Sequence, residues 1–129
     1  MQEYTETYTN PDNEQANSDS KQSNPDSKQA EKQRKLRDSV VRNFLDKEGR
    51  LTSIPAQLKK KLIILEHLAE KLEPERVYEE AEINAFIRLY HEDYATIRRE
   101  FIVQGFMARE NERYIRTPRT AARRWEELS

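Results

Sequence analysis

Arginine is the residue type whose number and spacing in this sequence could do chemistry. The stretch from Arg98 to Arg124 holds eight arginines against three glutamates, a net charge of +5. The preceding stretch from Glu66 to Asp93 holds three basic and nine acidic residues, a net charge of −6. A guanidinium is a planar fork that pairs well with phosphate, so a positive stretch of this kind favours anion binding.

Catalytic chemistry has little support in the sequence. His67 and His91 are the two histidines, and neither stands at a recognised metal-ligand spacing, so each is read as a helix-surface residue. The glutamates at positions 79, 80 and 82 suit the first turn of a helix and need no chemistry there. A glycine-rich phosphate loop and a nucleophile elbow are both absent. We therefore expect no enzyme, no metal site and no cofactor.

Composition narrows the class of protein further. A length of 129 residues supports one domain and a tail, but only 35% of the residues are hydrophobic while 36% are charged. The mean hydropathy of −1.10 indicates that some segment lacks a core. The sequence contains no cysteine, no apolar run of about 18 residues and no secretory signal at its start. We expect a cytoplasmic protein that does not cross a membrane.

The first 30 residues differ in composition from the rest. They are rich in Asn, Gln, Ser, Asp and Lys, and the run Asp-Ser-Lys-Gln occurs at residues 19–22 and again at 26–29. Such a segment cannot bury enough apolar surface to offset the entropy of ordering it. The sequence therefore predicts a disordered tail over residues 1–30 and one folded domain over residues 31–129.

The apolar spacing in the folded part predicts a mainly α-helical domain with a small β-hairpin. Leu36, Val40 and Phe44 lie on one face of a first helix, while Asn111 favours a tight turn between two short strands. Thr117 and Pro118 have the residue types of an N-cap and first position for a last helix. In chain order, the expected elements are a helix over 30–45, an extended piece over 50–55, helices over 56–72, 79–91 and 94–104, strands over 106–109 and 113–116, and a helix from 117 carrying Ala121, Trp125 and Leu128.

Three helices followed by a hairpin is the order of a winged helix-turn-helix domain. In that fold the third helix of the unit lies in the major groove of DNA, and the hairpin reaches the adjacent backbone. The predicted fold class is therefore a winged helix-turn-helix-like domain that follows a disordered tail.

Several blocks of the sequence resemble a known family. The blocks are Gly49–Pro55, Lys59–Leu65 with Leu68 and Ala69, Tyr78–Asn84, Asp93–Phe101, Gly105–Arg109 and Tyr114–Arg116. In this order, over about residues 40–116, they are similar to the prokaryotic domain-of-unknown-function family 2087. Members occur alone or after a metal-sensor-type winged-helix repressor domain, so the resemblance implies a transcription-linked context and no particular mechanism. Here Glu75 stands where members often have glycine, and Glu79 where they often have Ser or Thr.

The helix over 94–104 has two distinguishable faces. If Tyr94, Ile97 and Phe101 point inward, then Arg99 and its neighbours in the helical projection point outward. Arginine pairs well with guanine, and the remaining arginines could hold phosphates or form a solvated face paired with glutamates. The candidate DNA-binding residues are Thr96, Arg98, Arg99, Arg109, Arg113, Arg116, Arg119, Arg123 and Arg124.

A second interpretation concerns the apolar residues beside those arginines. Exposed β-branched side chains suit a contact with another protein, although they can also meet a thymine methyl group or pack under the last helix. Ile102, Val103 and Trp125 are the candidate interface residues. The sequence thus predicts a DNA-associated transcriptional regulator, or an accessory domain of one, that binds double-stranded DNA. The alternative is an interaction module without DNA affinity that binds a regulatory protein or a second copy.

Overall fold

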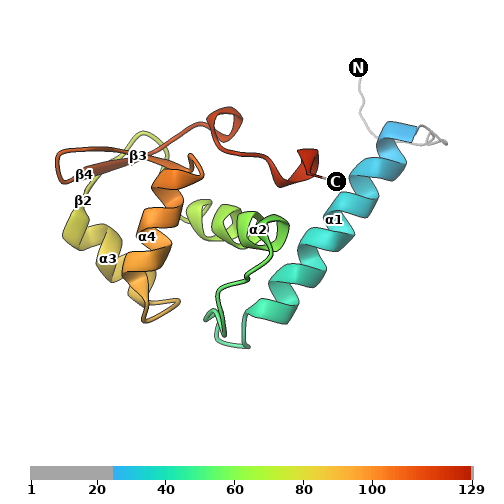
Figure 1. Ribbon diagram of the computed structural model, residues 1–129, viewed down its shortest axis with the longest axis horizontal. Coiled ribbons are helices and arrows are strands. Elements are labelled where there is room, and N and C mark those ends of the chain that lie inside the picture. The colour runs from blue at the N-terminus through green and yellow to red at the C-terminus, as the bar shows by residue number, and fades with distance from the viewer. Residues whose placement is uncertain (1–24, 129) are drawn as a thin grey trace, which may run out of the picture. The chain divides into compact units, whose positions relative to one another are not determined.

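Residues 25–128 are described in the computed structural model (Figure 1). They form four α-helices, α1 (Pro25–Phe44), α2 (Leu58–Ala69), α3 (Glu80–Arg88) and α4 (Tyr94–Val103). The chain divides within α1 into two compact units, Met1–Leu36 and Arg37–Ser129, and the second contains every later element. A mainly helical protein with a small antiparallel sheet is confirmed.

The first helix begins earlier than the sequence analysis predicts. Residues 25–30 are helical instead of belonging to a disordered tail, whereas the rest of the predicted tail, residues 1–24, lies outside the described residues. Pro25 is well suited to a first helical turn because its fixed φ is already helical and its missing N–H needs no partner. An acidic residue type at position 26 suits the N-terminus of a helix, and good helix formers follow.

A three-stranded antiparallel sheet stands beside the helices. Its strands are β2 (Val77–Glu79), β3 (Met107–Glu110) and β4 (Arg113–Arg116), in the order β2-β4-β3. Strands β3 and β4 are the predicted hairpin, and Asn111 in their turn has the left-handed φ of 59° that the turn requires. Strand β2 is a finding that the sequence did not predict, because three residues are too few for a periodic signal.

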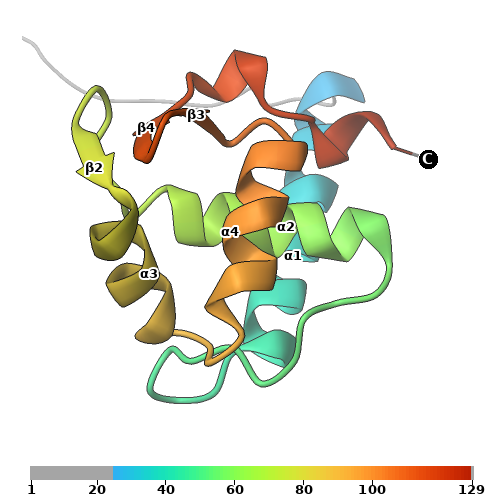
Figure 2. The ribbon, with the colours of Figure 1, turned by 60° about the vertical axis from the view of Figure 1, so that its left-hand side comes forward.

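The core of the second unit forms around α2. Leu62, Ile63 and Leu68 on this helix are completely buried. Helix α4 packs on both α2 and α3, contributing Ile97 and Phe101 to the same core (Figure 2). Burial of these side chains provides the main favourable free energy of folding and fixes which face of α4 points outward.

The C-terminal segment corrects a prediction. In place of one helix from residue 117, two short 3-10 turns occur at Arg119–Ala121 and Trp125–Glu127. The segment packs closely on the end of α4, where a Cβ at Gly105 would lie 3.0 Å from the carbonyl oxygen of Ala121. The Arg123 amide also donates to the carbonyl oxygen of Gln104 at 2.9 Å. These contacts fix the C-terminal segment against the end of α4.

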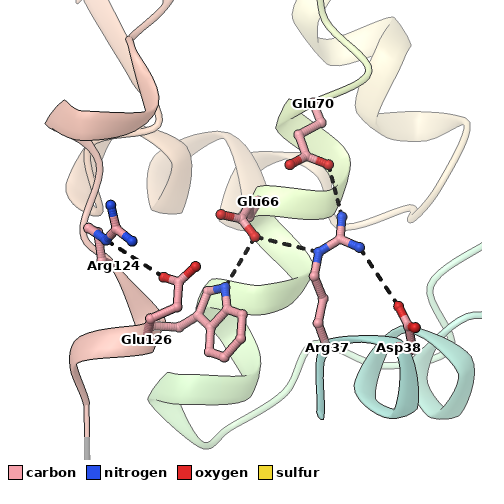
Figure 3. A network of polar contacts seen from close by, with 7 residues as sticks. Arg37, Asp38, Glu66, Glu70, Arg124 and Glu126 are labelled. Carbon is pink, nitrogen blue, oxygen red and sulfur yellow. Dashed lines mark hydrogen bonds and ion pairs between the residues drawn. The ribbon is translucent and has the colours of Figure 1, made fainter. Parts of the chain in front are cut away.

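A polar network fastens this segment to α2. The indole Nε1 of Trp125 donates to Oε1 of Glu66 at 3.1 Å, and the Nε of Arg37 lies 3.6 Å from the same oxygen (Figure 3). Arg37 also donates from Nη2 to Oε1 of Glu70 at 2.9 Å. Glu66 is only 4% exposed, so these partners offset the cost of removing its carboxyl group from water.

The loop before α3 contains a strained residue. Glu75 has φ of 67°, a left-handed conformation that glycine adopts without cost and other residues do not. This is the position at which the resemblance indicates glycine. A few residues later, the amide of Glu79 donates to Oε1 of Glu82 at 2.9 Å and so satisfies one free donor at the start of α3.

Candidate functional site

A groove of about 190 Å³ runs between α4 and the hairpin and is lined by five of the twelve candidate residues. Arg98, Arg99 and Arg109 supply its positive charge. Its apolar lining comes from Ala95, Ile102, Val103 and the ring of Tyr114.

The orientation of α4 determines which side chains reach this groove. Asp93 caps the helix by accepting a hydrogen bond from the amide of Thr96 at 3.4 Å. Ile97 and Phe101 are buried, whereas Arg99 is exposed and the side chain of Val103 is 64% exposed. The predicted inward positions of Ile97 and Phe101 and the outward positions of Arg99 and Val103 are therefore confirmed. The other four residues assigned to these faces are half-buried, namely Tyr94, Ala95, Thr96 and Ile102.

The three arginines of the groove differ in how firmly they are held. Arg98 is half-buried, and its Nη1 donates to Oδ1 of Asn84 on α3 at 2.5 Å. Arg109 donates from Nε to the carbonyl oxygen of Asn111 at 2.9 Å within its own hairpin. The side chain of Arg99 has no hydrogen-bond or ion-pair partner in the described part of the chain. Arg99 is thus the groove arginine most available to an outside partner.

Tyr114, which lines the groove, is hydrogen-bonded to Glu80, and the sequence analysis names neither as a candidate site residue. The Tyr114 hydroxyl donates to Oε1 of Glu80, at the start of α3, at 2.6 Å. This bond lowers the pKa of Glu80, and the positive charges of Arg98 and Arg109 also lower it. Burial, together with the same hydrogen bond, raises the pKa of Tyr114. The alternation of Arg113, Tyr114 and Ile115 in a strand predicts that the ring points inward, but nothing in the sequence identifies its partner.

The remaining candidate arginines do not all belong to the groove. Arg116 is half-buried and donates to the carbonyl oxygen of Leu72 at 2.8 Å, so its role here is structural. The Nε of Arg124 lies 3.8 Å from carboxylate oxygens of both Glu126 and Glu127. Arg116 and Arg124 therefore have partners within the protein, which the sequence spacing does not show.

Three more arginines and one threonine occupy intermediate positions. Arg113 is exposed on the hairpin, with its Nε 3.5 Å from Oε2 of Glu79. Arg123 is exposed just beyond α4, whereas Thr96 is half-buried in the first turn of that helix. The side chain of Arg119 lies outside the described part of the structure.

Trp125 is not available as an interface residue. Trp125 is 3% exposed and packs on α2, and this burial disfavours a contact between its side chain and a partner. Of the three apolar candidates, Ile102 is half-buried and Val103 is exposed, and both line the groove. Of the three apolar candidates, therefore, only the two on α4 have side chains that reach the surface.

The described residues show no feature of a metal site or a membrane-spanning helix. No group of three or more His, Cys, Asp or Glu in residues 25–128 is placed to hold a metal ion. The described helices include none with the length and apolar character needed to cross a membrane. Burial lowers the pKa of His67, with Lys71 and Arg37 adding to the effect.

Comparison with known proteins gives one result. Residues 50–116, just over half of the chain, match a family described as an uncharacterized protein conserved in bacteria, DUF2087. The match includes α2, α3, α4 and the hairpin, and therefore the whole groove. No curated protein and no solved structure shows significant similarity to the chain.

Proposed function

The chain belongs to DUF2087, a family of uncharacterized bacterial proteins, and we propose that it is a DNA-associated transcriptional regulator or an accessory domain of one. In this proposal α4 enters the major groove of double-stranded DNA, and the hairpin contacts the adjacent backbone. The observation that carries the proposal is the groove between α4 and β3, where Arg98, Arg99 and Arg109 gather beside an outward-facing helix surface.

The order of the elements supports this geometry. The succession α2, β2, α3, α4, β3 and β4, with β2 paired to β4, is that expected of a winged helix-turn-helix domain. In such a domain the helix before the hairpin is the recognition helix. Here that helix is α4, and its outer face carries Arg99.

Two kinds of contact with DNA are proposed, one to base edges and one to phosphate. Arg99 is exposed on the middle of α4, from which a guanidinium can reach base edges, and arginine to guanine is the commonest specific contact. Arg109 lies on the hairpin, where it is suited to a phosphate. The exposed Glu110 and Glu112 at the hairpin turn disfavour phosphate there, so we place the backbone contact at Arg109 and away from the turn.

The proposal is tested by fluorescence anisotropy with labelled duplex DNA of mixed sequence. We expect Arg99→Ala and Arg109→Ala each to weaken binding by about tenfold, the usual order for a charged contact. Arg42→Ala, an exposed arginine in the last turn of α1, is the matched control and should bind as the wild type does. Equal affinity of all four proteins would remove the groove from the proposal.

A second candidate function is a protein-interaction module, and the exposure of Val103 favours it. An exposed branched side chain beside half-buried Ile102 suits the apolar centre of a protein interface. If this function is the correct one, Val103→Asp should abolish association with a partner or a second copy. Sedimentation velocity of the two proteins would detect the loss of self-association, and the arginine variants would then leave DNA binding unchanged.

A further inference from the structure

We propose that Val103 reads the methyl group of thymine, so that the preferred duplex carries thymine near the guanine contacted by Arg99. This inference rests on the proposed function and specifies the DNA that the same groove would take. The three groove arginines do not explain why an apolar side chain beside them is exposed. Among described residues, Val103 is one of three large hydrophobic side chains that are strongly exposed, at 64%.

The position of Val103 on α4 matches that of Arg99. The two residues are four apart, so their side chains lie on the same face of the helix, about 6 Å apart along its axis. Successive bases of one DNA strand are about 3.4 Å apart along the duplex axis. A helix lying along the major groove would therefore present Arg99 and Val103 to bases about two steps apart.

The chemistry of the two side chains differs in the way that base readout requires. Guanine presents the N7 and O6 acceptors that a guanidinium can contact with two hydrogen bonds. Thymine is distinguished in the major groove by its C5 methyl group, which favours an apolar contact. Half-buried Ile102 and Ala95 line the same groove and extend the apolar surface around Val103.

The probe is a duplex whose one strand repeats guanine-guanine-thymine-thymine, so that each thymine lies two steps from a guanine, paired with its adenine–cytosine complement and compared with the same duplex containing uracil in place of thymine. Uracil keeps the base pairing and lacks only the methyl group. We expect the wild type to bind the thymine duplex about fourfold more tightly, the factor that corresponds to burial of one methyl group. Val103→Ser should remove this preference and still bind both duplexes.

The control variant is Val77→Ser. Val77 is also an exposed valine, at 55%, but it lies on β2 and does not line the groove, so its substitution should keep the preference. Equal binding of both duplexes by the wild type would overturn the thymine inference and leave DNA binding standing. Binding of neither duplex would instead overturn the proposed function. Loss of self-association in Val103→Ser, without any change in thymine preference, would assign this face to a protein partner.

Discussion

The Tyr114 hydroxyl donates a 2.6 Å hydrogen bond to Glu80 Oε1 and so joins strand β4 to the first turn of α3. The bond lies beside Arg98 and Arg109, whose charges act on both partners. Because Tyr114 also lines the groove, this pair connects the fold of the sheet to the shape of the proposed DNA surface. Substitutions at this pair should therefore affect stability and binding together.

Tyr114→Phe should lower the stability of the protein in a pH-dependent way. The hydrogen bond lowers the pKa of Glu80 from its ordinary value of 4.5, so its stabilisation is present above pH 4.5 and is lost as the pH falls through the lowered pKa. Urea unfolding at a series of pH values should show a constant gap between wild type and variant above pH 4.5 that narrows below it. A gap that does not change with pH would show that the hydroxyl stabilises the fold without favouring the ionised carboxyl group.

His67 should make the protein less stable in mildly acidic solution. Burial lowers its pKa from the ordinary value of 6.5, so the folded state disfavours the proton that the unfolded state accepts. Stability should therefore fall as the pH drops through 6.5 toward the lowered pKa. His67→Gln should flatten this part of the melting-temperature profile, whereas His91→Gln is the control. Identical profiles of melting temperature against pH for wild type and His67→Gln would show that His67 does not cause this loss of stability.

Glu75→Gly should stabilise the protein by up to about 1 kcal/mol. The gain comes from relief of the left-handed backbone at φ 67° and is reduced by the greater entropy of glycine in the unfolded chain. Asn111→Gly is the matched control, since Asn111 has φ of 59° and asparagine tolerates this conformation better. Thermal unfolding should show a larger rise in melting temperature for Glu75→Gly than for Asn111→Gly. The reverse order would contradict the conclusion that the backbone at Glu75 is strained.

Trp125→Phe should lower the free energy of unfolding by about 1–3 kcal/mol, because buried Glu66 loses a hydrogen-bond donor. The same substitution should cost less in a Glu66→Gln background, since an amide oxygen accepts more weakly than a carboxylate. Chemical denaturation of the four proteins completes a double-mutant cycle. An equal cost of Trp125→Phe in both backgrounds would mean that the indole acts only through packing.

Much of the fold could be predicted where apolar residues recur with a clear period. Ile97 and Phe101 placed the inner face of α4 correctly, and Asn111 marked the turn of the hairpin. The prediction of one continuous last helix is wrong, because the spacing of Ala121, Trp125 and Leu128 also suits separate turns. What decides between these alternatives is the close approach to Gly105, a tertiary contact that the local sequence does not record.

The candidate site was predictable in part for a related reason. The exposure of Arg99 follows from the helix period, but the partners of Arg116 and Arg124 depend on folding of distant or irregular backbone. Arg116 reaches the carbonyl oxygen of Leu72, 44 residues away, and no spacing rule contains that pair. Trp125 was placed among interface residues because its burial depends on Glu66 and α2, which a linear pattern does not bring together.

The salt dependence of DNA binding by the full chain tests most directly whether the groove arginines contact DNA. We predict that the logarithm of the binding constant falls linearly with the logarithm of salt concentration between about 50 and 200 mM, with a slope of about −2 to −3. Arg109→Ala should reduce the size of this slope by about one, as expected for one lost phosphate contact. A slope near zero, or the same slope for the wild type and Arg109→Ala, would contradict phosphate binding at this groove.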